Sequence, residues 1–296
     1  MGNLACATAY VIFGLNIVFC KDIANAHVVS PIALFTLRAL GASSLFWLIS
    51  MFMPQEKVDR KDLPKIAAAS FLGLFLTQIT FLKAITMSTS LDTSIISTLS
   101  PIFTMLTAAV VLKEPITFKK AGGVAISFAG VLFLIFNSIT VNRGADHTSP
   151  LGIFLLLCNA ASFALYLGIF RPLIAKYSVV TFMKWMFLFS LLMSLPFSFQ
   201  SLIAINVSAI STQVMLEIGF LIFFATFVAY FLIPYGQKRV RPTIVSMYSY
   251  VQPVLAAVIS ICIGMDVLTW QKVVATIFVF GGVVIVNRSR AAGQPR

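Results

Sequence analysis

The stretch SPIFTMLTAAVVLKEP at residues 100–115 decides the fold, because its pattern returns as QPVLAAVISICIGMDV at residues 252–267. In each copy a proline is followed thirteen residues later by an acidic residue: Pro101 by Glu114, and Pro253 by Asp266. The copies lie 152 residues apart, and the residues between proline and acid are mostly apolar. A repeat of this kind indicates a duplicated structural unit, and its apolar character indicates a unit that lies in lipid.

The composition extends this conclusion to the whole chain. Of 296 residues, 59% are hydrophobic and 10% are charged, whereas a soluble protein carries about a quarter charged residues. Ten apolar runs come near the roughly 20 residues that a membrane-spanning helix needs. They lie near residues 4–20, 31–53, 64–85, 91–112, 119–137, 150–170, 180–201, 212–235, 242–264 and 270–287. Little sequence remains for a separate soluble catalytic domain.

These runs are too long, and too uniformly apolar, for the alternating strands of a membrane barrel. We therefore predict an all-α integral membrane protein with ten transmembrane helices. Because each repeat holds five spans, an odd number, the second must enter the membrane from the opposite side, which predicts two inverted five-helix repeats. The expected repeats are residues 1–137 and 150–288, with a connecting loop at 138–149 and a tail at 289–296.

The net charge of +12 suggests nucleic-acid binding until the charges are mapped. With ten spans threaded, sixteen of the 21 Lys and Arg residues fall on the side that holds both termini and four fall on the other. The remaining one, Arg38, lies inside a span. This asymmetry follows the positive-inside rule and predicts both termini in the cytoplasm. We therefore expect a lipid bilayer as partner, and no nucleic acid.

Three features carry a resemblance to a known family: the paired five-span repeats, the proline-to-acid pattern with small residues after it, and the opening helix with its following turn. The small residues and the opening positions are Gly122, Gly123, Gly130, Gly281 and Gly282, and Phe13, Gly14, Asn16, Ser30, Pro31 and Arg38. Over essentially its whole length the chain resembles the EamA family of the drug/metabolite transporter superfamily. That resemblance implies a bacterial inner-membrane carrier of small metabolites, often an exporter, that works by alternating access.

Charged residues inside apolar spans are the first candidates for a binding site, because they are costly in lipid. Arg38 is expected either to meet an anionic group of a substrate or to reach outward to the interface. Glu217 is the acid that lies well inside a span; it could pair with Arg38, bind protons or receive a cationic substrate. Asp92 starts a span, where capping the helix is the expected role.

Polar and aromatic side chains within spans complete the candidate list. Tyr248 and Gln252 stand one turn apart on one helical face and are predicted to line a path. Further candidates for contact with substrate are Asn16, Gln78, Asn159, Tyr166 and Tyr230. Pro101 and Pro253 are expected to kink their helices. Glu114 and Asp266 are expected to cap the helices that follow them.

A secondary transporter of a small organic metabolite, such as an amino acid, accounts best for these features. No nucleotide-binding motif is present to power it. A passive channel or structural protein is the alternative, and an intramembrane enzyme is disfavoured because no catalytic acids or His residues meet in the spans. We expect no cofactor or metal, since His27 and His147 fall in loops and the four cysteines lie far apart. The four-residue spacing of Gly122, Ile126 and Gly130, together with the pair Gly281 and Gly282, predicts close helix packing, with a homodimer as one outcome.

Overall fold

The computed structural model describes residues 2–111, 117–140, 148–237, 248 and 251–288, and within these ranges every regular element is a helix. The first half contains α1 (Gly2–Ala26), α2 (Pro31–Met51), α3 (Leu63–Ser70), the π-helical η1 (Phe71–Leu76), α4 (Thr77–Ile85), α5 (Ser90–Ser97), α6 (Ser100–Val111) and α7 (Phe118–Thr140). The second contains α8 (Pro150–Ile169), α9 (Arg171–Lys176), α10 (Val179–Ile203), the short 3₁₀ turn η2 (Val207–Ala209), α11 (Thr212–Phe220), the π-helical η3 (Leu221–Val228), α12 (Ala229–Gln237), α14 (Val251–Cys262) and α15 (Trp270–Arg288).

Six helices among the described residues are long and apolar enough to cross a membrane. They are Gly2–Ala26, Pro31–Met51, Leu63–Ile85, Pro150–Ile169, Val179–Ile203 and Thr212–Ile233. Ser-Pro pairs begin two of them: Ser30 accepts a hydrogen bond from the amide of Ala33, and Ser149 from that of Gly152. A proline in the first turn loses no helical hydrogen bond, so it favours a helix start there. The chain is therefore a helical, multi-pass membrane protein.

The expected span 91–112 is a broken helix. Its first part, α5, ends at Ser97, and α6 begins at Ser100, with Pro101 as its second residue. The amides of Thr98 and Leu99 each bond to a carbonyl three residues earlier, which forms a tight turn between the parts. In the second copy Pro253 lies in α14, but residues 249–250 before it lie outside the described residues. In the first copy the interruption therefore falls just before the proline rather than at a bend within one continuous helix.

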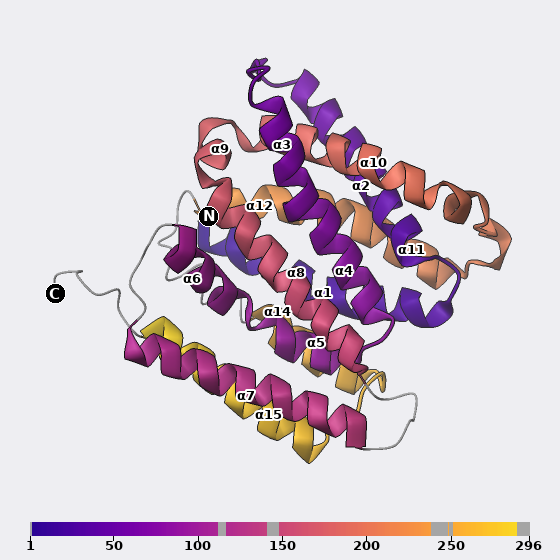
Figure 1. Cartoon of the computed structure of the whole chain (residues 1–296). Coiled ribbons are helices and arrows are strands. Elements are labelled where there is room, and N and C mark those ends of the chain that lie inside the picture. The colour runs from indigo at the N-terminus through magenta and orange to yellow at the C-terminus, as the bar shows by residue number, and fades with distance from the viewer. Residues whose placement is uncertain (1, 112–116, 141–147, 238–247, 249–250, 289–296) are drawn as a thin grey trace.

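Helix α7 lies alongside α15 on one side of the bundle (Figure 1). A Cβ atom placed on Gly123 would lie 2.6 Å from the carbonyl oxygen of Gly282, and one on Gly130 would lie 3.0 Å from that of Ala275. Since residue numbers rise along α7 as they fall along α15, the two helices are antiparallel. Of the predicted stripe, Gly130 lies at this close approach, whereas Gly122 faces open space and Ile126 is exposed. Gly123 takes the place of Gly122 in the backbone approach, and dimerisation stays a prediction.

The remaining helices pack around two apolar clusters. The larger cluster joins α1, α4, α5 and the α7–α15 pair. The smaller cluster joins α2 and α3 to α8, α9 and α10, and contains Phe46, Phe182 and Phe187. Helix α10 packs along α2, and α1 lies against α12 and α14. Elements of both halves thus share one core.

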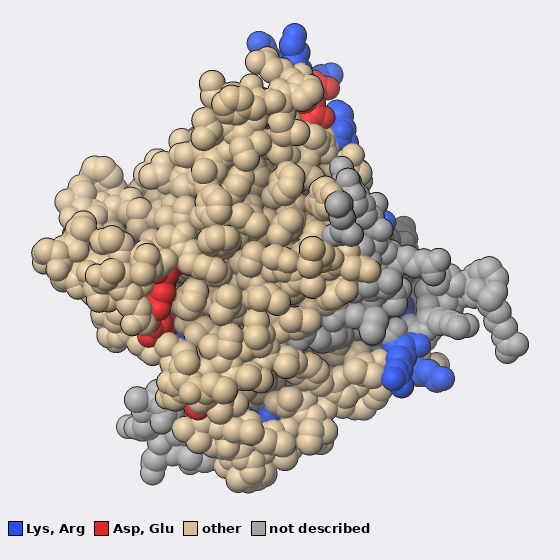
Figure 2. Space-filling model, turned by 180° about the vertical axis from the view of Figure 1, so that it is seen from behind, with Lys and Arg blue, Asp and Glu red and all other residues tan. Residues whose placement is uncertain are grey.

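The surface agrees with burial in lipid. In Figure 2 the visible face is mostly uncharged, and the Lys and Arg side chains gather at the top and at the lower right. We call the end of the bundle that carries residues 52–62 and α9 the basic end. The continuous helix from Leu63 to Ile85 runs from this end to the opposite one, where α5 begins.

Candidate functional site

Arg38 of α2 is buried in the bundle, with 2% of its surface exposed. Its Nε donates a hydrogen bond of 2.9 Å to Thr226 Oγ1, and its Nη1 lies 3.7 Å from the Sγ atom of Cys20. The thiol of Cys20 in turn points to Asn16 Oδ1, at 3.8 Å. Among the described residues no acidic side chain forms an ion pair with Arg38. We call Asn16, Cys20, Arg38 and Thr226 the arginine cluster: a buried cation with neutral partners.

The π-helical segment η3 places Thr226 for this role. Thr226 Oγ1 donates to the carbonyl of Leu221, five residues earlier, at 2.7 Å. The hydroxyl proton is therefore used within the helix, and its oxygen is free to accept from Arg38. In η1, Thr77 donates in the same way to Leu72, also at 2.7 Å. Short π-helical segments within α-helices are frequent at functional sites.

A second layer of polar contacts links the two π-helical segments to their neighbours. The side-chain amide of Gln78 donates to the hydroxyl of Tyr230 at 3.2 Å, and that of Asn159 donates to the carbonyl of Thr77 at 2.7 Å. The side-chain amide oxygen of Gln78, Oε1, is buried without a hydrogen-bond partner. The sequence candidates Gln78, Asn159 and Tyr230 thus lie together between α4, α8 and α12.

Tyr166 and Gln252 have packing contacts. A Cβ atom on Gly73 would come within 2.5 Å of the Tyr166 ring, so this ring fills the space that the glycine leaves. The carbonyl oxygen of Gln252 faces Gly14 of α1. Tyr248 is half-buried but stands between residues outside the described ranges, and Glu114 lies outside them itself.

Glu217 does not form the ion pair with Arg38 that the sequence allowed. The side-chain amide of Gln213 donates both to Glu217 Oε1, at 3.1 Å, and to Asp22 Oδ2 of α1, at 2.9 Å. Glu217 Oε2 is buried without a partner. One amide thus joins two carboxyl groups from different halves of the chain, which leaves Arg38 without a fixed counter-charge.

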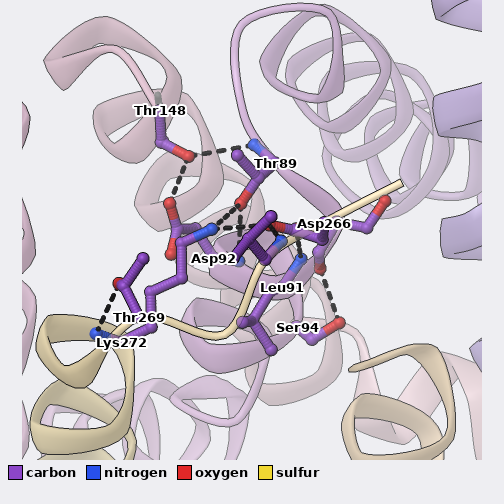
Figure 3. Close-up of polar contacts among 10 residues, drawn as sticks. Thr89, Leu91, Asp92, Ser94, Thr148, Asp266, Thr269 and Lys272 are labelled. Carbon is purple, nitrogen blue, oxygen red and sulfur yellow. Dashed lines mark hydrogen bonds and ion pairs between the residues drawn. The ribbon is translucent and has the colours of Figure 1, made fainter. Parts of the chain in front are cut away.

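At the end opposite the basic end, the side chain of Asp266 from the second half contacts the start of α5 from the first half (Figure 3). Its Oδ2 accepts from the amide of Leu91 at the start of α5 (2.8 Å), and its Oδ1 from Lys272 Nζ (2.6 Å). Asp266 therefore does not cap the helix that follows it; Thr269 accepts from the amide of Lys272 there. Lys272, which threading left in an external segment, has a buried side chain. The buried ion pair lies within the second half, and its two side chains are hydrogen-bonded to Leu91 and Thr89 of the first half.

Three further residues complete this contact. Asp92 is not a helix cap; the cap of α5 is Thr89, which accepts from the amide of Asp92. Thr148 accepts from the amide of Thr89 at 2.9 Å and donates to Asp92 Oδ2 at 2.5 Å. We call Thr89, Leu91, Asp92, Thr148, Asp266 and Lys272 the junction.

The basic end is closed by a different contact, which we call the basic-end clamp: Asp62, Lys65, Lys176 and Tyr177. Asp62 accepts from Lys176 at 2.5 Å, from the Tyr177 hydroxyl at 2.8 Å and from Lys65 at 3.0 Å. The hydrogen bond from Lys176, followed by those from Tyr177 and Lys65, lowers the pKa of Asp62 well below its ordinary value. The bond to Asp62 likewise raises the pKa of Lys176. The clamp stays ionised across the physiological pH range.

A sequence profile of the EamA-like transporter family matches residues 1–136 and 150–288, nearly the whole chain. The chain belongs to this family. An uncharacterized transporter of Archaeoglobus fulgidus is 26% identical over 90% of this chain and 92% of its own length. The uncharacterized transporter YdfC of Bacillus subtilis is 29% identical over 87% of this chain and 80% of its own length. This EamA-like chain is therefore a transporter homologue and not an enzyme.

The fold of this EamA-like protein is also found in a crystal structure whose description names no function. That structure has a TM-score of 0.63, with 16% sequence identity, and the match covers 96% of this chain and 95% of the other. The likeness concerns the fold alone.

Sequence reasoning missed several residues that contact the predicted ones. Cys20 follows Asn16 by one helical turn, so the period of the helix could have placed the two together. Thr226, Asp22, Gln213 and Thr148 gave no such signal, because their partners lie in distant parts of the EamA-like chain.

Proposed function

We propose that the protein is a secondary transporter that moves a small organic solute by alternating access, with the arginine cluster as part of its solute site. The observation that carries this proposal is the burial of Arg38 beside neutral groups only. A buried cation without a counter-charge is costly. An anionic group of a solute would supply that charge, so its binding is favoured at this position.

The chemistry around Arg38 favours a solute with one anionic group and a small polar or aromatic body. A single guanidinium suits one carboxylate, and it offers planar, paired donors for it. The amide of Gln78, with its unpartnered oxygen, and the hydroxyl of Tyr230 lie in the same bundle. An amino acid or a related metabolite fits this set better than a polyanion, which would need several cations. The expected direction of transport is export across the bacterial inner membrane.

Contacts between α7 and α15 support the proposal of two inverted repeats, 1–137 and 150–288, joined by 138–149. Ser127 donates to the carbonyl of Val279, which stands 152 residues later, the spacing of the sequence repeat. Ala275 and Gly282 stand 152 residues after Gly123 and Gly130, so the contacts Gly123–Gly282 and Gly130–Ala275 are counterparts of each other. Such reciprocal contacts are expected between two antiparallel halves that are related by a two-fold axis in the membrane plane.

The π-helical segments support the same relation. The pairs Thr77–Leu72 and Thr226–Leu221 have the same five-residue spacing and the same distance, and they are 149 residues apart. With ten spans, the excess of Lys and Arg on one side supports a position of both termini in the cytoplasm. Two matched halves that meet at a buried polar site can open it alternately to either side.

Counterflow in proteoliposomes tests this function. Vesicles containing the purified chain are loaded with one unlabelled amino acid from a panel, and uptake of the same labelled amino acid is followed. A carrier exchanges the two pools and saturates, whereas a channel does neither. Arg38→Ala is expected to weaken solute affinity roughly ten- to a hundredfold, because a hydrogen bond to a charged group contributes about 1.5–3 kcal/mol.

The matched control is Lys65→Ala, which removes an exposed cation at the basic end. It should transport at the rate of the unchanged protein. Arg38→Lys should retain part of the affinity, since it keeps the charge but loses the paired donors. Unchanged affinity in Arg38→Ala would remove Arg38 from the solute site.

A further inference from the structure

The junction holds two carboxyl groups and one ammonium group that the proposed solute site does not use. Asp92 and the two residues Asp266 and Lys272 come from different halves of the chain, and all three are buried. If all were ionised, the group would carry one net negative charge away from water. Burial of an uncompensated charge is costly, and protonation of one carboxyl group removes that cost.

Asp266 has the contacts of an ionised carboxylate. It accepts from Lys272 Nζ at 2.6 Å and from the amides of Leu91 and Val267 at 2.8 and 3.0 Å. These donors favour the negative form of Asp266. The N-terminus of α5, beside which its carboxylate lies, favours it as well. The proton is therefore not held by Asp266.

Asp92 has fewer donors. Oδ2 accepts from Thr148, and Oδ1 is buried without any hydrogen-bond partner (Figure 3). Lys272 does not reach it; the ammonium group donates instead to Asp266 and to Thr89. A protonated carboxyl group accounts for this environment, because it satisfies Thr148 without placing a second negative charge beside Asp266.

The other charges that face the junction do not change this assignment. Helices α8 and α14, which pack on α5, contain no Asp, Glu, Lys or Arg. Helix α1 contributes Lys21 and Asp22. Lys21 donates to the carbonyl of Ile85 at 3.2 Å and interacts electrostatically with Asp266, which further favours the ionised form of Asp266. Asp22 binds Gln213. Helix α15 contributes Lys272 to the junction. Asp92 thus has no cationic side chain within ion-pair distance among the described residues.

We propose that Asp92 is a proton-binding site of this transporter, protonated while the junction is closed and ionised when it opens. On opening, the contacts of Leu91 with Asp266 and of Thr89 with Lys272 break, and water reaches Asp92. Its O–H bond then breaks, the proton passes to water, and the carboxylate remains hydrated. One proton is released to the junction side at each opening, and Asp92 takes up its next proton from the opposite side while the junction is closed. One proton therefore crosses the membrane in each cycle, and a pH difference across the membrane biases transport. The coupling rests on the proposed function, whereas the protonation of Asp92 does not.

Infrared spectroscopy of the full chain in lipid nanodiscs tests the site without any solute. The protein should show the carbonyl stretch of a protonated carboxylic acid at neutral pH, and Asp92→Asn should lose it. Asparagine has the shape of protonated aspartic acid and keeps the bond from Thr148, so this variant should fold. Asp62→Asn, at the ionised clamp, is the matched control and should leave the band unchanged. Glu217→Gln identifies any separate band from Glu217. Persistence of every protonated-acid band in Asp92→Asn would overturn the proposal, as would the absence of such a band from the unchanged protein.

The transport arm separates this inference from the proposed function. In the counterflow assay, Asp92→Asn should exchange labelled amino acid at a rate close to that of the unchanged protein. It should lose the acceleration that an imposed pH gradient gives to net uptake. Absence of counterflow in the unchanged protein would contradict the proposed function and leave the infrared result standing. Retention of pH-driven uptake in Asp92→Asn would contradict the coupling alone.

Discussion

The two ends of the bundle are each held by an aspartate with lysine partners, but the lysines have opposite surroundings. In the basic-end clamp, the side chains of Lys65 and Lys176 are 63% and 51% exposed, while that of Asp62 is 7% exposed. In the junction, those of Lys272 and Asp266 are 10% and 1% exposed. A pair with an exposed cation is screened by water and contributes little, whereas removing one partner of a fully buried pair leaves an uncompensated charge. The same two residue types therefore make a weak contact at the basic end. At the junction, the loss of either partner is costly.

This contrast suggests different resistance to opening. The basic-end clamp can separate into water, where each charge is hydrated. The junction can separate only as water hydrates its charged groups. Opening at the junction is thus expected to be the step in which Asp92 releases its proton.

The largest effect is expected from Lys272→Met, which leaves Asp266 buried without its cation. The free energy of unfolding should fall by about 3–5 kcal/mol, measured by thermal or denaturant unfolding in a fixed detergent. Lys65→Met removes an exposed cation at the basic end, where Asp62 keeps its bonds to Lys176 and Tyr177, and should have little effect. Adding Asp266→Asn to Lys272→Met should restore most of the loss. Equal effects of the two lysine substitutions would break the comparison between the ends.

A middle-sized effect is expected from Thr148→Val, which keeps the shape but removes the hydroxyl group of Thr148. The amide of Thr89 would then lack its acceptor, which costs about 1–3 kcal/mol for a buried donor. Thr148→Ser retains the hydroxyl and should behave like the unchanged protein in the same unfolding measurement. If valine and serine gave the same stability, Thr148 would not hold the junction together.

The smallest effect concerns pH at the basic-end clamp. Because the pKa of Asp62 is lowered, its contribution is fully present above the ordinary aspartate value of about 4 and is lost only as the pH falls further. Because the pKa of Lys176 is raised, its contribution is lost only as the pH rises beyond the ordinary lysine value of about 10. The difference in melting temperature between the unchanged protein and Asp62→Asn should therefore be constant from about pH 5 to pH 8. A difference that changes within this range would show that another group titrates in the clamp.

The sequence predicted the helices well where the signal was local. Apolar runs of the right length, bounded by Ser-Pro pairs at residues 30–31 and 149–150, correspond to helices that begin at Pro31 and Pro150. It marked Arg38 as a charge inside a span but left open whether the side chain faces the bundle or reaches outward, and the structure buries it in the bundle. It did not predict the π-helical segment η1, which involves a hydrogen bond that Ser162 supplies from another helix.

Site contacts were harder to predict for the same reason. Arg38 and Thr226 are 188 residues apart, and Leu91 and Asp266 are 175 apart. No periodicity within one helix connects such pairs. On α7 the sequence assigned Gly130 to the close packing correctly but Gly122 wrongly, because Gly122 and Gly123 are equally small and only the position of α15 distinguishes them.

The sequence by itself determined that this chain is a helical membrane protein, and the resemblance of its motifs pointed to the family that the comparison found. Hydrophobicity and helix length suffice for this, since lipid leaves the backbone few alternatives. Only the tertiary structure decided which charges are paired. In the structure, Arg38 has no acidic partner among the described residues, the side chain of Asp266 lies against the start of α5, and Lys272 is buried. The energy of an ion depends on the groups within a few ångströms of it, and those groups come from distant parts of the chain.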